Sequence, residues 1–196
     1  MSPTQLTIRQ ATPDDAQEIT TLHAAGWRKG YAAFFDPEVL EQAIEERRTR
    51  WTDLLKKRDR EGTLLFVGEQ DGMIVAFAHA GPARDHPGDL EIYSFYTHPT
   101  YWGSGIGRRL MMHVLAFALT RGYVRMYLYV YSQSVRARRF YTRLGFSETG
   151  RTTATRLPGD VVTRDIEYVH DGQNEGSSVE AAARRDHWGA MPNRRS

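Results

Sequence analysis

The sequence predicts an α/β (α+β) fold, in which helices cover both faces of a mixed central β-sheet. Three observations predict it. Strand-like and amphipathic segments alternate along most of the 196 residues, which is typical of such sheets. The segments 63–69 and 73–80 flank Gln70-Asp71-Gly72 and indicate an antiparallel hairpin. A glycine-rich loop joins the strand-like run 90–97 to the amphipathic run 106–119.

Each element follows from its local pattern. Residues 6–9 alternate as a first strand, and Thr12, Pro13 and two carboxylates start a helix that we expect to end at about Ala25. Apolar spacing over 37–60 predicts a second helical region. The remaining elements are the hairpin, the strand 90–97, the helix 106–119, a strand over 125–131, a helix over 134–144, a strand from Phe146 and a terminal strand pair around 157–160.

Composition limits the class of protein. Residues 1–170 have enough apolar content for one domain, whereas the polar segment 171–196 is expected to be a disordered tail. A formal net charge of +2 argues against nucleic acid as a partner. The chain has no cysteine, and its histidines lack metal-ligand spacing, so we expect neither disulfides nor a metal. Without a bilayer-length apolar run or a signal-peptide pattern, the sequence predicts a cytoplasmic protein with no membrane partner.

The loop from Trp102 to Leu110 carries Gly103, Gly105 and Gly107 at every second position. Glycine lets the backbone approach a ligand closely, and at the start of a helix the unpaired amides and the helix dipole favour a phosphate. The spacing differs from the dinucleotide fingerprint G-x-G-x-x-G, and the lysine and hydroxyl of a P-loop are missing. The alternative to a phosphate site is a flexible turn that binds nothing.

A second motif follows, Ser134-Val135-Arg136-Ala137-Arg138-Arg139-Phe140-Tyr141-Thr142-Arg143-Leu144-Gly145-Phe146. Helical spacing puts Ser134, Ala137 and Tyr141 near one face. Together the two motifs resemble the GCN5-related N-acetyltransferase (GNAT) family, whose signature is a Q/R-x-x-G-x-G/A loop between strand and helix, then a helix carrying N-x-x-A-x-x-F-Y-x-x-x-G-F. The resemblance covers residues 6–169. Two positions depart from it: Trp102 replaces Gln or Arg, and Ser134 replaces Asn.

The resemblance implies transfer of an acetyl group from acetyl-CoA to a primary amine, by direct attack in a ternary complex. Amides of the glycine loop would bind the pyrophosphate, and the end of the preceding strand would align the pantetheine arm. The implied cofactor-binding residues are Phe95, Tyr96, Thr97, Gly103, Ser104, Gly105, Ile106, Gly107, Arg108, Ser134 and Ala137.

Acetyl transfer needs a neutral amine and a proton for the departing thiolate. The resemblance makes Tyr141 the proton donor, the alternative being a packed aromatic ring that positions the sulfur. Glu91 is the candidate base, because the histone-acetylating branch of the family has its glutamate at this point of the same strand; the alternative is a solvated carboxylate. Strand alternation places Glu91 on the face of Phe95. The branch that acetylates protein amino termini has its glutamate where this chain has Tyr129.

The resemblance implies an acceptor site between the first two helices and the loop 84–86. In this region Trp27, Tyr31 and Phe34 form one aromatic face if the first helix continues through Gly30. Such a face could hold an apolar or cationic acceptor, or be ordinary core. We expect a small-molecule amine as the acceptor, then a protein lysine or amino terminus. The rival from another class is a non-catalytic acyl-CoA-binding module. Because family members often pair through their last strands, a homodimer is also expected.

Overall fold

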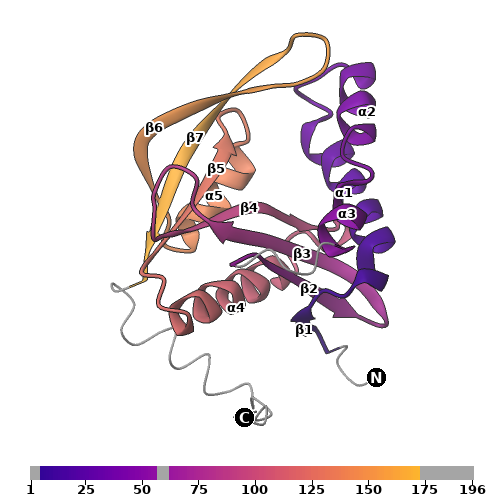
Figure 1. Cartoon of the computed structure of the whole chain (residues 1–196). Coiled ribbons are helices and arrows are strands. Elements are labelled where there is room, and N and C mark those ends of the chain that lie inside the picture. The colour runs from indigo at the N-terminus through magenta and orange to yellow at the C-terminus, as the bar shows by residue number, and fades with distance from the viewer. Residues whose placement is uncertain (1–4, 57–61, 173–196) are drawn as a thin grey trace.

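The computed structural model describes residues 5–56 and 62–172. One sheet holds the strands in the order β1-β2-β3-β4-β5-β7-β6, and this mixed sheet confirms the predicted fold class (Figure 1). Only the neighbours β4 and β5 are parallel within it. The strands are β1 (Thr7–Gln10), β2 (Leu64–Gln70), β3 (Met73–Pro82), β4 (Leu90–Thr97), β5 (Arg125–Tyr131), β6 (Ser147–Arg156) and β7 (Val162–Asp171).

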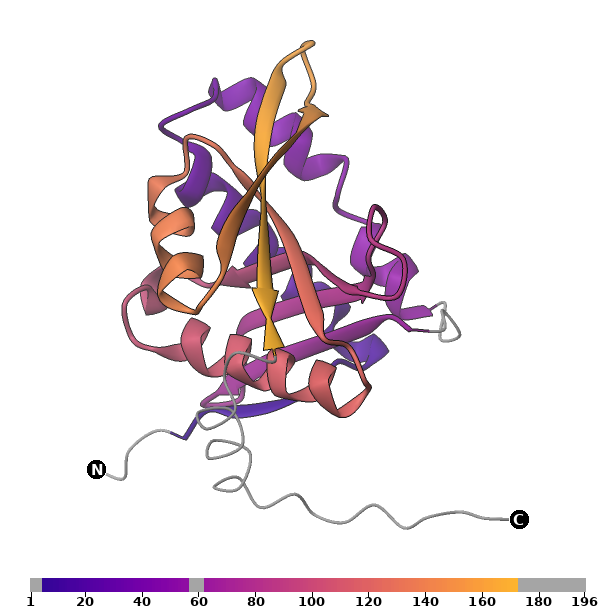
Figure 2. The same ribbon diagram turned by 90° about the vertical axis from the view of Figure 1, so that its left-hand side faces the viewer.

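Helices cover both faces of the sheet (Figures 1 and 2). One face carries α1 (Ala16–Tyr31), α2 (Pro37–Glu45) and α3 (Arg50–Lys56), with Ile19 and Trp51 packed on Phe77. The other carries α4 (Ile106–Thr120) and α5 (Val135–Arg143), which share the largest core cluster with β2, β3 and β4. None of the helices in the described ranges is long and apolar enough to cross a membrane.

Two helices differ from the predicted ones. The first helix runs past Ala25 to Tyr31. Within it, Gly26 packs against the ring of Tyr96, since a Cβ there would be 2.7 Å from that ring. The second helical region is two helices, since α2 packs on one core cluster and α3 on another. The end of that region and the predicted tail from 173 onward lie outside the described residues.

A β-bulge in β4 overturns the predicted alternation of its side chains. Ser94 pairs with His79 and Ile92 pairs with Ala80, so Tyr93 is an extra residue without a partner in β3. Ile92 and Phe95 therefore both face the α4 side. The prediction that Phe95 shares a face with the odd-numbered residues before it was wrong, because one inserted residue reverses the alternation.

Past its first two residues, β4 separates from β5. Only Leu90 and Glu91 pair with β5, so the second half of β4 presents an edge that β5 does not cover. On the other side of this gap, the β6–β7 hairpin arches over toward α2 (Figure 1). Leu157 at the hairpin tip is buried in one cluster with Trp27 and Leu40, so the arch is closed by apolar packing.

Candidate active site

Two cavities meet where β4 separates from β5. The first, which we call the loop cavity, has a volume of about 930 Å³ and is lined by the glycine loop, the second half of β4 and the start of α5. The second, the arch cavity, has a volume of about 860 Å³ and is lined by residues of α1, α3, β6 and β7. Both are lined by Tyr93, Ser94, Tyr96 and Tyr129. These four residues form the junction of the two cavities.

The glycine loop has the geometry of an anion site. Gly103 and Gly105 have φ of 87° and 89°, in the left-handed region that favours glycine. A Cβ on Gly107 would lie 3.1 Å from Thr97 Oγ1. Because α4 begins directly after Gly105, the amides of its first turn lack helical partners and the positive end of its dipole lies at the loop cavity.

Most of the predicted cofactor-binding residues line the loop cavity. They are Phe95, Tyr96, Thr97, Gly103, Gly105, Gly107, Arg108, Ser134 and Ala137. Two side chains do not. Ser104 Oγ donates a hydrogen bond to the Tyr101 carbonyl at 2.7 Å, and Ile106 is buried in the core. These two side chains shape the loop, because one ties it back on itself and the other anchors the helix that follows.

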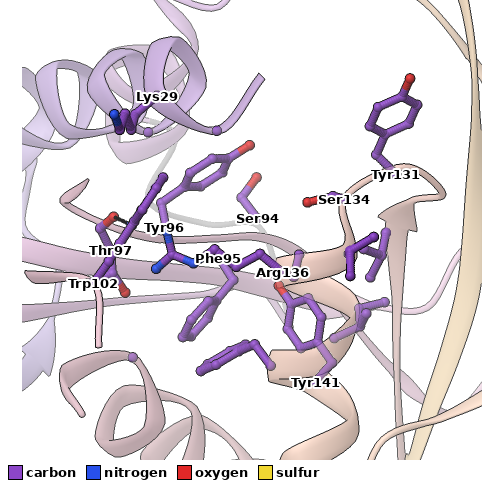
Figure 3. A pocket seen from close by; sticks show the side chains of 18 of the residues that line it. Lys29, Ser94, Phe95, Tyr96, Thr97, Trp102, Tyr131, Ser134, Arg136 and Tyr141 are labelled. Atoms are coloured by element: carbon purple, nitrogen blue, oxygen red, sulfur yellow. Dashed lines mark hydrogen bonds between the residues drawn. The ribbon is translucent and has the colours of Figure 1, made fainter. Parts of the chain in front are cut away.

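Trp102 and Arg136 connect the two walls of the loop cavity (Figure 3). The Trp102 indole donates a hydrogen bond to the Thr97 carbonyl at 2.9 Å, and the Arg136 guanidinium lies 3.4 Å from the centroid of the indole ring. Burial lowers the pKa of Arg136. The sequence marked Trp102 only as a departure from the family pattern, since nothing local pairs it with an arginine of a later helix.

Tyr141 projects from α5 into the loop cavity (Figure 3). Its ring lies near those of Phe95, Phe140 and Phe146, with centroids at 6.4, 5.2 and 5.7 Å. Burial raises the pKa of Tyr141, and the nearby Tyr31 raises it further. The hydroxyl is therefore protonated at neutral pH, although it is a weaker acid than a free phenol.

The three predicted acceptor-site aromatics lie in different places. Trp27 is 8% exposed, packs with Leu40 and lines the arch cavity. Tyr31 and Phe34 line the loop cavity instead. The helix does continue through Gly30, but it ends at Tyr31, so Phe34 has left the helical face and its ring lies 5.4 Å from that of Tyr131.

The arch cavity has a neutral histidine in its wall. Trp51 Nε1 donates a hydrogen bond to His23 Nδ1 at 3.3 Å. Burial lowers the pKa of His23 to about 3, and the charges of Arg50 and Arg47 lower it as well. Of the predicted loop 84–86, Arg84 and Asp85 line this cavity.

Glu91 lies away from the junction. Its carboxylate is 2% exposed and accepts hydrogen bonds from the Arg84 backbone N–H at 3.2 Å and from Arg84 Nε at 3.1 Å, with Arg84 Nη2 closer still. Among the residues that line the two cavities, Glu91 is absent. The carboxylate is thus neither solvated nor open to an acceptor, and its role as base stays a prediction.

Tyr129, which the resemblance aligned with the glutamate of the amino-terminal branch, lines the junction and contacts Glu167, a residue that no motif indicated. The Tyr129 hydroxyl lies 2.8 Å from Asp85 Oδ2 and 2.8 Å from Glu167 Oε2. Glu167 is fully buried on β7 and also contacts His86 and Thr149. No sequence signal pointed to Glu167, because it comes from a strand without a motif and reaches the site only through the sheet order.

The family model described as the acetyltransferase (GNAT) family matches residues 22–146. The chain belongs to the GNAT family. Like its relatives it is an acyltransferase of the N-acetyltransferase class.

Relatives and solved structures of the GNAT family are similar to this chain over most of its length. A probable N-acetyltransferase of Mycobacterium tuberculosis is 26% identical over 152 residues, covering 78% of this chain and 86% of the relative. An aminoglycoside N(6')-acetyltransferase of Stenotrophomonas maltophilia is 29% identical, covering 78% and 93%. The crystal structure of the PaiA N-acetyltransferase of Thermoplasma acidophilum in complex with coenzyme A superposes with a TM-score of 0.72 at 19% identity, covering 85% and 99%.

Proposed function

We propose that this GNAT protein transfers the acetyl group of acetyl-CoA to the primary amine of a small molecule, by direct attack in a ternary complex. The observation that carries the proposal is the junction, at which a cavity with an anion-binding loop meets a second, separate cavity. Direct transfer requires both substrates to be bound at the same time and in contact. Two cavities that meet at a junction would allow this.

The loop cavity suits coenzyme A in two ways. Amides of the glycine loop and the side chain of Arg108 would hold the pyrophosphate. The edge of β4 that β5 leaves uncovered would hydrogen-bond the amides of the pantetheine arm as an added strand does. Bound in this way, coenzyme A would have its thioester near the junction.

Tyr141 is proposed as the proton donor. Attack by the amine breaks the thioester C–S bond, and the sulfur leaves with the electron pair. The Tyr141 hydroxyl, which its raised pKa keeps protonated, supplies the proton for that sulfur. The aromatic rings around Tyr141 would hold its hydroxyl in place beside the sulfur.

The arch favours a small acceptor over a protein. The hairpin tip packs on α2 through Leu157 and closes one side of the arch cavity, so an extended polypeptide would have to displace this packing to reach the junction. The relative that acetylates an aminoglycoside is consistent with a small acceptor. A protein lysine or amino terminus stays the second candidate, and a non-catalytic acyl-CoA-binding module the third.

Release of coenzyme A thiol in the presence of a panel of amines tests the proposal. Turnover with a small amine and acetylated product by mass spectrometry would support it. Turnover only with peptides would select the second candidate. Tight binding of acetyl-CoA by calorimetry, with no thiol released by any amine or peptide, would select the third.

Replacing Tyr141 by Phe tests the proton donor. We expect kcat to fall about 100-fold, because general acid catalysis contributes roughly that much or more, while the Kd of acetyl-CoA measured by calorimetry changes little. Tyr123→Phe makes the same change outside both cavities and serves as the matched control. A loss of cofactor binding equal to the loss of kcat would instead show that Tyr141 only positions the sulfur.

A further inference from the structure

The Tyr129 hydroxyl occupies an unusual position at the junction. It lies 2.8 Å from a carboxylate oxygen of Asp85, on the loop before β4, and 2.8 Å from one of Glu167, on β7. Asp85 is exposed and lines the arch cavity, whereas Glu167 is fully buried. A single phenol thus links a carboxylate beyond the reach of water to one that water reaches.

The Tyr129 hydroxyl has too few hydrogens to form a hydrogen bond to both carboxylates. His86 Nε2 lies within hydrogen-bond distance of Glu167 Oε2, at 2.9 Å, and the Thr149 hydroxyl donates a hydrogen bond to Glu167 Oε1 at 2.7 Å. A phenol has only one O–H to donate, so it satisfies either Asp85 or Glu167. While both carboxylates are ionised, one of the two short contacts has no hydrogen in it. Such an arrangement is stabilised by one additional proton.

The charged groups around this site favour Asp85 as the proton's destination. Burial would raise the pKa of Glu167, but hydrogen bonds from His86, Thr149 and Tyr129 outweigh it and hold that pKa below its usual value. Arg151 Nε, 3.9 Å from Glu167 Oε2, adds positive charge on the same side. Burial and both carboxylates raise the pKa of Tyr129, so the phenol conducts a proton without becoming a stable anion.

We propose that Tyr129, with Asp85 and Glu167, takes the proton from the ammonium group of the acceptor. The inference rests on the proposed function. One N–H bond of the ammonium breaks and its electron pair stays on nitrogen. The proton moves to the Tyr129 oxygen while Tyr129 passes its own hydrogen to Asp85. The phenol is unchanged, Asp85 becomes the neutral acid, and its exposure returns the proton to water.

The proposal assigns this role to a site that both substrates can reach. Tyr129 lines both cavities. Glu91, the base that the family resemblance implies, is held by Arg84 and lines neither cavity. Glu91 could accept the proton only after Arg84 had moved away.

The first experiment compares Tyr129→Phe with wild type over a pH series, using ethylamine and the much weaker base 2,2,2-trifluoroethylamine, or the matching pair built on the best acceptor of the panel. With the basic amine near pH 7 we expect kcat/KM to fall about 100-fold. The loss should shrink toward none as pH rises, and with the weakly basic amine, because an amine that is already neutral needs no base. Tyr123→Phe is the matched control.

Two results would overturn the proposal. An equal loss with both amines at every pH would show that Tyr129 only positions the substrates. A larger loss in Glu91→Gln that vanishes with the weakly basic amine would make Glu91 the base.

A second measurement is independent of turnover. In the protein bound to coenzyme A, carboxyl carbon signals of Asp85 and Glu167 are followed by NMR from acid to neutral pH. We expect each signal to titrate in two steps in wild type, because protonating one carboxylate redirects the phenol hydrogen to the other. In Tyr129→Phe the shared steps should weaken. Independent single steps in wild type would overturn the proposal. If no amine were acetylated, the proposed function would fail, yet this titration would still decide on the shared proton.

Discussion

At the scale of single residues, His23 couples the stability of the fold to pH. Its ordinary pKa is 6.5, and burial lowers that pKa to about 3 in the folded protein. The unfolded chain therefore binds a proton more readily than the folded protein, so stability is lost as pH falls below 6.5. For one proton the slope approaches about 1.4 kcal/mol per pH unit.

Urea unfolding at several pH values between 7 and 4 measures this effect. We expect the free energy of unfolding of wild type to fall more steeply with acid than that of His23→Gln, whose side chain does not titrate. Comparing slopes removes the fixed cost of the substitution in the core. Equal slopes in the two proteins would show that His23 takes up its proton without unfolding.

At this scale the sequence predicted which side chains are candidates for the chemistry, but not which residues surround them in the fold. Tyr141 was found because it belongs to a motif, and the structure places it in the loop cavity. Glu91 was chosen by its place on a strand, but its role depends on Arg84, which returns across the β3–β4 loop to bind it. Tyr129 meets Glu167 only because β5 pairs with β7, a register that no local pattern specifies.

At the scale of elements, the glycine loop is the part whose conformation can be tested directly. Gly105→Ala puts a side chain on a residue with φ of 89°, which costs about 1–2 kcal/mol. Because this residue sets the start of α4, we expect coenzyme A affinity to fall as well, by about tenfold, the equivalent of 1.4 kcal/mol.

Gly122→Ala is the control for the loop. Gly122 has φ of 85°, a Cβ there meets nothing within 4 Å, and the residue lines neither cavity. We expect Gly122→Ala to lower the free energy of unfolding in urea by about as much as Gly105→Ala does, and to leave the affinity for coenzyme A in calorimetry unchanged. An unchanged affinity in Gly105→Ala would remove the loop from cofactor binding.

The elements themselves were largely predictable, because their signals are local. Hydrophobic periodicity and caps placed the strands and helices, and glycines placed the loop. The bulge at Tyr93 was not predictable, because an inserted residue leaves no mark on the composition of a strand. It arises because His79 pairs with Ser94 while Ala80 pairs with Ile92.

At the scale of the whole molecule, cofactor binding should stabilise the fold. A ligand at 100 times its Kd adds about 2.7 kcal/mol, which raises the Tm of a domain of this size by roughly 5–11 °C. We expect coenzyme A to produce such a shift in thermal unfolding. Pantetheine at the same concentration should shift the Tm much less, because it lacks the phosphates that the loop is proposed to hold. Equal shifts would contradict the phosphate assignment.

The fold class followed from the alternation of strand-like and amphipathic segments, the hairpin and the glycine loop, and the resemblance of the two motifs to the GNAT family agrees with it. The separation of β4 from β5 and the closure of the arch by Leu157 are long-range features that only the assembled sheet reveals. A homodimer and a cytoplasmic location stay predictions. β6 lies at one edge of the sheet and β1 at the other, so the edge position of β6 agrees with the expected pairing through the last strands.

Because the loop cavity and the arch cavity share four lining residues, the proposed function implies that each product would leave through a cavity of its own. Coenzyme A would then be able to leave while the acetylated amine is still bound, and the acetylated amine would be able to leave before coenzyme A. An inhibitor that fills one cavity would therefore leave the other open to its own substrate, whereas a molecule that spans the junction would block the binding of both substrates.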